Sequence, residues 1–155
     1  MFVFLDIDGV MVPAKSWKSP PLLPDGFYQF SDDAVRVLQG LVADNTTLVL
    51  TTSHKSRFTL QQWKNIFERR GIRLTRLKKL DTSTPNLNRR EEIVRWMNMN
   101  GVPQVFIIID DDKSLNDLPN TLKDQLILTN STVGLTDAHA DEIKAKLKQQ
   151  YQLVE

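Results

Sequence analysis

The sequence has no cysteine among its 155 residues, and it has no long apolar run. The absence of cysteine excludes disulfide bonds and thiolate-ligated metal sites, and it suits a reducing compartment. No stretch approaches the ~20 apolar residues that a membrane-spanning helix requires. The first apolar run is too short for a signal peptide and ends in acidic residues. We therefore expect a soluble, cytoplasmic protein that does not associate with membranes.

A large excess of charge of either sign is also lacking, because the formal net charge is +1. The charges are nevertheless unevenly distributed. Residues 55–95, which we call the basic segment, hold twelve Lys or Arg residues and four acids, a local charge of +8; residues 1–54 sum to −3 and residues 96–155 to −4. The basic segment either coats solvated helices and loops, or it attracts a polyanion such as the end of a nucleic acid.

The apolar residues indicate the class of fold. The length fits one domain over residues 1–155, and a hydrophobic content of 41% suffices for its core. Apolar residues form four short, continuous runs, the pattern of parallel strands that are buried on both faces. These runs are residues 2–7, 46–51, 104–109 and 125–129. Residues 72–77 alternate in polarity and are a candidate fifth strand at a sheet edge.

Segments with helical spacing separate the runs. Ser31 and Thr136 are suited to start the first and last helices, and Gly71 and Gly101 to end the second and third. The four apolar stripes are Ala34, Val35, Leu38, Leu41 and Val42; Leu60, Trp63, Ile66 and Phe67; Ile93, Val94 and Met97; and Ala140, Ile143, Leu147 and Tyr151. This alternation predicts an α/β fold with a Rossmann-like, doubly wound parallel sheet of about five strands. Residues 12–26, with four prolines, indicate an ordered loop or flap near the first strand.

Two groups of aspartates follow buried strands. Asp6 and Asp8 end the first run, and alternate residues of an extended chain point to the same side. Asp110, Asp111 and Asp112 end the third run. Ligands of doubly wound sheets bind at the carboxyl ends of strands, so we expect both groups to line one crevice. Clustered carboxylates repel one another unless a cation lies among them, and oxygen ligands suit Mg²⁺.

The second run ends in two threonines and a serine. Thr52 and the amides after it could bind phosphate oxygens, because a strand-to-helix turn offers free N–H groups. The pair Thr52–Ser53 could equally be an ordinary N-cap of the next helix. The sequence alone leaves both interpretations open.

These segments resemble the motifs of the haloacid dehalogenase (HAD) superfamily, the aspartate-nucleophile phosphatases. The first motif is matched by "DIDGV" at residues 6–10, the second by "LVLTTS" at 48–53 and the fourth by "FIIIDDD" at 106–112. The third motif needs a basic residue, and "NRREEIVRWM" offers Arg89 or Arg90. The order and the strand placement of the motifs agree over nearly the whole chain.

The resemblance implies a role for each matching residue. Asp6 would attack phosphorus and form an aspartyl phosphate, while Asp8 protonates the leaving oxygen and later activates water. Mg²⁺ would be bound by Asp6, the backbone carbonyl of Asp8, and Asp111. The phosphate-binding residues that the resemblance implies are Thr52, Ser53 and Arg89. An acid at position 8 favours a phosphatase, because true dehalogenases lack it.

Some residues near the motifs have no assigned role. The second residue of the acidic pair is the usual metal ligand, which selects Asp111 and leaves Asp110 and Asp112 as alternatives. His54 and His139 are not needed by this chemistry, so we expect each to be a surface or capping residue. His54 stands where the family pattern suggests a tryptophan.

The segments "RREEIVRWM", "IIIDDD" and "LTNSTVGLTDAHADEI" are similar to the small HAD-like domains of bacterial RNA-repair proteins. The intervals between the motifs have no room for a sizeable cap domain. An open site suits a macromolecular substrate, and the basic segment favours an RNA or DNA end over a sugar phosphate, with a phosphoprotein as another possibility. The alternative from another class is a catalytically silent module that binds phosphate or nucleic acid.

Overall fold

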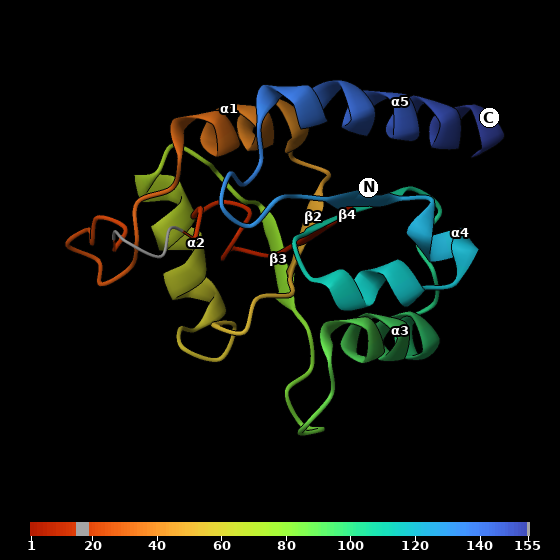
Figure 1. Cartoon of the computed structure of the whole chain (residues 1–155), viewed down its shortest axis with the longest axis horizontal. Coiled ribbons are helices and arrows are strands. Elements are labelled where there is room, and N and C mark those ends of the chain that lie inside the picture. Colours follow the sequence, from red (N-terminus) through yellow and green to blue (C-terminus); the bar gives the residue numbers. More distant parts are fainter. Residues whose placement is uncertain (15–18, 155) are drawn as a thin grey trace.

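The computed structural model describes residues 1–14 and 19–154, which form an α/β sandwich of three layers (Figure 1). Five parallel strands make one sheet in the order β3-β2-β1-β4-β5. The strands are β1 (Phe2–Leu5), β2 (Thr47–Leu50), β3 (Arg76–Lys79), β4 (Phe106–Asp110) and β5 (Leu126–Leu128). The prediction of a doubly wound parallel sheet of about five strands is confirmed.

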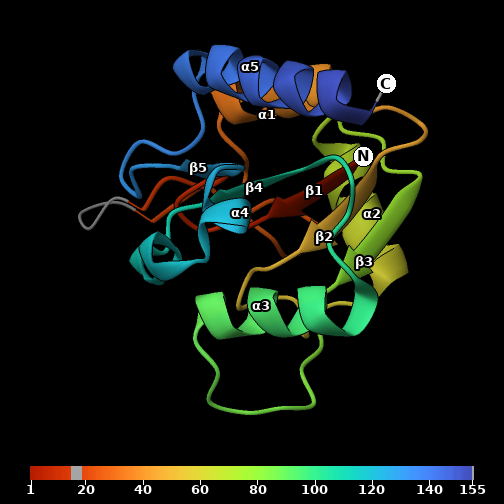
Figure 2. The same ribbon diagram turned by 90° about the vertical axis from the view of Figure 1, so that its right-hand side faces the viewer.

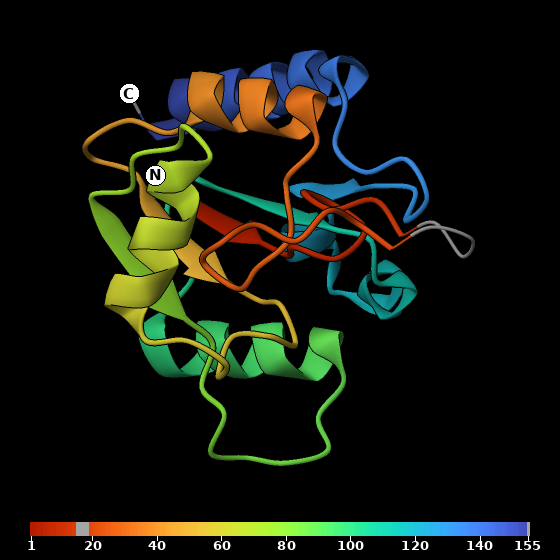
Figure 3. The ribbon, with the colours of Figure 1, turned by 90° about the vertical axis from the view of Figure 1, so that its left-hand side faces the viewer.

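Helices cover both faces of the sheet (Figure 2). One face carries α1 (Asp32–Leu41), α2 (Leu60–Arg69) and α5 (Asp137–Val154). The other carries α3 (Arg89–Asn100), the short 3₁₀ helix η1 (Lys113–Asp117) and α4 (Asn120–Lys123). The loop between β3 and α3 projects beyond α3 in two views (Figures 2 and 3).

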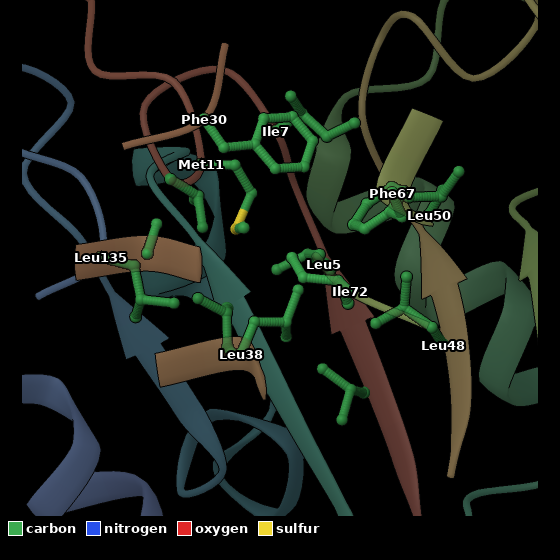
Figure 4. Close-up of a cluster of buried hydrophobic side chains, with 14 of the residues drawn as sticks. Leu5, Ile7, Met11, Phe30, Leu38, Leu48, Leu50, Phe67, Ile72 and Leu135 are labelled. Atoms are coloured by element: carbon green, nitrogen blue, oxygen red, sulfur yellow. The ribbon is translucent and has the colours of Figure 1, made fainter. Parts of the chain in front are cut away.

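The central strands contribute to two hydrophobic clusters, one on each face of the sheet. Leu5 of β1 belongs to the larger cluster, in which Leu38 of α1 and Phe67 of α2 also lie (Figure 4). Phe4 points the other way, toward Trp96 of α3. Because successive strand residues are buried on opposite faces, the apolar runs are continuous rather than alternating.

Local signals in the sequence explain where the helices begin and end. Ser31 caps α1, as predicted, by accepting a hydrogen bond from Ala34 N. Asn88 caps α3 through a capping box with Glu91. Gly101 has a φ of +84° at the end of α3, a backbone conformation that favours glycine. The helices η1 and α4 were not predicted, because each is too short to show a helical stripe.

The structure shifts the candidate edge strand and decides between the two interpretations of the Thr52–Ser53 pair as regards the N-cap. The edge strand begins at Arg76, not at residue 72, because β2 starts at Thr47 and Arg76 is the residue that pairs with it. The pair Thr52–Ser53 does not cap a helix. The capping residue of α2 is Thr59, whose side chain accepts from Gln62 N, so a turn of several residues separates β2 from α2.

Within the described residues, the connections between the strands contain the helices above and loops, and no cap domain. The predicted loop at residues 12–26 lies partly outside the described residues; its described portion includes an antiparallel bridge between Leu22 and Tyr28. No helix in the described ranges combines the length and apolarity needed to cross a membrane.

Candidate active site

The candidate site lies where the chain changes direction across the sheet. From β1 the chain proceeds to β2 and β3 on one side, and α3 then carries it back to β4 on the other side of β1. Leu5 of β1 pairs with Ile109 of β4, so the next residues, Asp6 and Asp110, lie side by side. Doubly wound sheets bind ligands at such switch points.

Arg89, the first residue of α3, reaches the two carboxylates at the strand ends. Its Nη1 lies 2.6 Å from Asp110 Oδ2 and 3.4 Å from Asp6 Oδ1. Thr51, directly after β2, donates its hydroxyl to Asp110 Oδ2 at 3.1 Å. Three neighbouring strands and one helix therefore direct polar side chains to one buried point.

Asp110 has both carboxylate oxygens occupied by hydrogen bonds. Oδ2 accepts from Arg89 and Thr51, while Oδ1 accepts from the backbone N–H groups of Asp111 at 2.9 Å and Asp112 at 3.1 Å. The residue is fully buried. Asp110 therefore anchors Arg89 and shapes the turn at residues 110–112, which leaves it little capacity for a further ligand.

The charges of the site do not balance. The pKa of Asp6 is raised to about 9, first by burial and then by the neighbouring Asp110, against the opposing influence of Arg89. Burial also raises the pKa of Asp110, against the influence of Arg89. Burial disfavours the Arg89 cation, but Asp110 and Asp6 outweigh that effect and hold its pKa above the ordinary value. One guanidinium cannot compensate all the carboxylates, so the site favours the entry of another cation.

Asp111 completes a cluster of oxygen donors. Asp6, Asp110 and Asp111 each offer a ligand atom within 4.8 Å of the others. Gly9 makes room for this arrangement, because a Cβ there would lie 2.0 Å from Asp111 Oδ2. An oxygen-only set of this kind fits Mg²⁺. Since the oxygens of Asp110 are already bonded, Asp6 and Asp111 are the cluster members free to hold an ion.

Asp112 and Arg90, the alternatives that the sequence left open for the metal ligand and the third-motif cation, both contact η1 instead. The side chain of Asp112 turns away and accepts from Ser114 N at 2.9 Å as the N-cap of η1. Arg90 also faces η1, where its Nε donates to Asp117 O at 2.8 Å. Neighbouring helical residues point about 100° apart, so Arg89 alone of the pair reaches the strand ends.

Asp8 lies at the rim of the site, and its side chain is 49% exposed, against 5% for Asp6. His54 Nε2 lies 2.7 Å from Asp8 Oδ2. The expectation that His54 is a surface or capping residue is therefore wrong, because its ring is part of the site. The expectation is confirmed for His139 as a capping residue. Its Nδ1 accepts a hydrogen bond from the backbone N–H of Thr136, the residue that precedes α5, at 3.0 Å.

The turn after β2 contains two of the three predicted phosphate-binding residues, Thr52 and Ser53. Thr52 is fully buried, and its hydroxyl oxygen accepts from His54 N at 3.2 Å, whereas Ser53 is exposed. Lys55, which the sequence did not single out, is buried in the same turn and pairs with Glu92 Oε2 at 2.8 Å. A lysine in a polar turn carries no sequence signal of burial.

The basic segment is only partly a surface feature. Of its twelve cations, Lys55 pairs with Glu92 in the interior, and Arg89 lies in the site. Arg70 is also buried, where it binds Asp25 through two contacts of 2.6 and 3.1 Å. The other nine cations are not buried, although Arg69 also lies 3.8 Å from Asp25 and Arg90 donates to Asp117 O.

We predict that the charge imbalance makes stability depend on pH. Asp6 binds its proton more tightly in the folded than in the unfolded protein, so without divalent metal its contribution to stability is lost as the pH rises from about 4 to about 9. Asp6→Asn should abolish this loss. Its free energy of unfolding should exceed that of the wild type by more than ~2 kcal/mol at pH 9, but not at pH 4. Urea unfolding across this range measures the difference.

The exposed Asp141, on α5, provides the control for this prediction. Asp141→Asn makes the same chemical change in solvent and should follow the wild type at every pH. A gain for Asp6→Asn that is equal at pH 4 and pH 9 would contradict the raised pKa.

Known structures include proteins of the same fold. Two solved chains of the HAD domain of the effector protein Lem4 from Legionella pneumophila match with a TM-score of 0.61 and 14% identity. One match covers 96% of each chain, and the other, an inactive mutant, covers 99% of this chain and 97% of the other. At this identity the likeness establishes the fold alone. A search of curated proteins gave no match.

A family model described as the HAD domain in Swiss Army Knife RNA repair proteins matches residues 2–140. This range contains all five strands and every residue of the site described above. The motif order that suggested the superfamily is therefore matched by a model spanning most of the sequence. The chain belongs to this family of HAD domains.

Proposed function

We propose that the protein is a magnesium-dependent phosphohydrolase that works through an aspartyl-phosphate intermediate. The observation that carries this proposal is the buried Asp6 carboxylate, which lies beside Arg89 and Asp110 at the switch point of the sheet. Burying several carboxylates with one guanidinium is costly for stability. A phosphoryl group together with a divalent cation would supply charges and hydrogen-bond partners that the site accommodates.

Asp6 would be the nucleophile. One of its oxygens would bond to phosphorus as the bond between phosphorus and the ester oxygen breaks, giving an acyl phosphate. Arg89, 3.4 Å from Asp6, is placed to offset charge on the phosphoryl oxygens, and Thr52 and Ser53 would bind these oxygens from the turn after β2.

Asp6, Asp111 and the backbone carbonyl of Asp8 would hold Mg²⁺. When bound, the ion would neutralise charge on the transferring phosphoryl group. Gly9 supports this arrangement, because its lack of a side chain lets the Asp111 carboxylate approach β1. Thr129 donates to Gly9 O at 2.7 Å and so fixes the backbone of this turn.

Asp8 would supply and remove protons. It would protonate the leaving ester oxygen and then take a proton from the water that hydrolyses the aspartyl phosphate. Its exposed position at the rim supports this role, because the leaving group of a macromolecular ester must extend outward.

We further propose that the substrate is the phosphorylated end of a nucleic acid. The family description, which concerns RNA repair, supports this class. Lys78, Lys79 and Arg95 line one groove of about 340 Å³ that also includes the acids Asp81 and Glu92. Glu92 pairs with Lys55 and lies 3.8 Å from Arg89 Nε, so the groove adjoins the site. A strand extending from the site would meet these cations.

Turnover of a small aryl phosphate tests the proposed chemistry. We predict Mg²⁺-dependent release of p-nitrophenol from p-nitrophenyl phosphate, and Asp6→Asn should reduce it to background because an amide is not a nucleophile here. Asp141→Asn on the exposed face of α5 is the matched control and should retain wild-type activity. If the wild type is no faster than Asp6→Asn on this ester and on phosphorylated oligonucleotides, yet binds them, the silent binding module is the correct interpretation.

Alanine substitutions at two glycines distinguish an effect on metal coordination from an effect of backbone strain. Gly9 and Gly26 both have a positive φ, +77° and +84°, but a Cβ at Gly26 meets nothing within 4 Å. Gly9→Ala should weaken Mg²⁺ binding at least tenfold by displacing Asp111, whereas Gly26→Ala should change only stability, by about 1–2 kcal/mol. Calorimetric titration measures the Mg²⁺ affinity of both variants. If Gly9→Ala and Gly26→Ala bind Mg²⁺ equally well, Asp111 is not a ligand of the ion.

A charge reversal tests the substrate class. Lys78→Glu with Arg95→Glu should slow turnover of a phosphorylated oligonucleotide and reduce its salt dependence, since each neutralised phosphate contributes roughly 0.7 to the log–log slope for a single strand. Hydrolysis of the aryl phosphate should change little. Lys144→Glu with Lys148→Glu places the same charge change on α5, across the sheet, and should have little effect. If both double variants behave alike, the groove does not bind the nucleic acid.

A further inference from the structure

The Asp8 carboxylate has one partner among the described residues. Its Oδ2 lies 2.7 Å from His54 Nε2, and this is the hydrogen bond that the carboxylate forms within the described part of the chain. A half-exposed carboxylate has little packing to restrict its rotamers. The orientation of Asp8 therefore depends on the histidine.

His54 is itself held rigidly. Its ring packs edge-to-face on Phe27, with the ring centroids 5.7 Å apart and the planes at 80°. Its backbone is fixed at both ends of the turn, because His54 N donates to Thr52 Oγ1 and His54 O accepts from Arg57 N at 2.8 Å. The imidazole thus has a defined position from which to hold Asp8.

The support extends one layer further. Phe27 is fully buried and packs edge-to-face against Trp63 of α2 at 5.2 Å. The loop that carries Phe27 is bound to α2 by Arg70, which forms a two-point ion pair with Asp25 and donates from Nε to Tyr28 O at 2.9 Å. These contacts connect the core to the rim of the site through Phe27 and His54.

We propose that His54 is a positioning residue for Asp8, an inference that rests on the proposed function. With hydrogen on Nε2, the imidazole donates to Asp8 Oδ2 and leaves Oδ1 as the oxygen that carries the transferable proton. As the bond from Asp6 to phosphorus forms and the ester P–O bond breaks, this proton moves from Oδ1 to the leaving oxygen. His54 exchanges no proton in this step; it selects the oxygen and fixes its direction.

The test exploits the different need of two substrates for that proton. A phosphate ester of an alkyl alcohol has a poor leaving group that must be protonated, whereas 2,4-dinitrophenolate leaves without assistance. His54→Ala should lower kcat/KM for benzyl phosphate about 10–100-fold and for 2,4-dinitrophenyl phosphate less than about threefold, as a fraction of the 10²–10⁴ that general acid catalysis contributes. The kcat/KM values isolate the first, phosphoryl-transfer step.

Two amide variants test the contact itself. The amide nitrogen of His54→Gln can reach the place of Nε2, while that of His54→Asn is too short to do so. The glutamine variant should recover most of the lost activity on benzyl phosphate, and the asparagine variant should resemble His54→Ala. His139→Ala, which removes the other histidine, should match the wild type on both esters.

The outcomes separate this inference from the proposed function. Equal losses on the two esters, or no difference between the Gln and Asn variants, would overturn the positioning role while the phosphatase stands. A wild type without Mg²⁺- and Asp6-dependent turnover of either ester would overturn both.

Discussion

The buried ion pair between Arg89 and Asp110 is the interaction on which the rest of the site depends. It joins the start of α3 to the end of β4, at 2.6 Å and away from solvent. Asp110 could not remain buried as an anion without this partner, and an uncompensated charge of this kind costs about 3–5 kcal/mol. Because Asp110 also accepts from the N–H groups of Asp111 and Asp112, the same pair shapes the turn that brings Asp111 against Gly9.

Because Arg89 is bound mainly to Asp110, it compensates the negative charge of Asp6 only in part. Arg89 lies closer to Asp110 than to Asp6, so burial and the neighbouring carboxylate together raise the pKa of Asp6. A protonated Asp6 is a poor nucleophile. Any cation that enters beside Asp6 and Asp111 lowers the pKa of Asp6, so in the proposed mechanism binding of the ion and activation of Asp6 would be thermodynamically linked.

The sequence predicts the parts of this protein that depend on neighbours along the chain. The continuous apolar runs indicate strands buried on two faces, and the acids after Leu5 and Ile109 indicate where a ligand would bind. The choice between Arg89 and Arg90 needed the structure, because it depends on how α3 is rotated against the sheet. The start of the edge strand at Arg76 also depends on its partner, since β2 provides pairing from Thr47 onward.

His54 and Asp8 are 46 residues apart in the sequence, and no local sequence pattern predicts their contact. It depends on Phe27 being buried against α2, which in turn depends on the ion pair between Arg70 and Asp25. The site therefore has two separate supports. Asp6 is held from the α3 side of the sheet by Arg89, and Asp8 from the α2 side by His54. In the proposed mechanism, these two supports would position the nucleophile and the proton donor from opposite faces of the sheet.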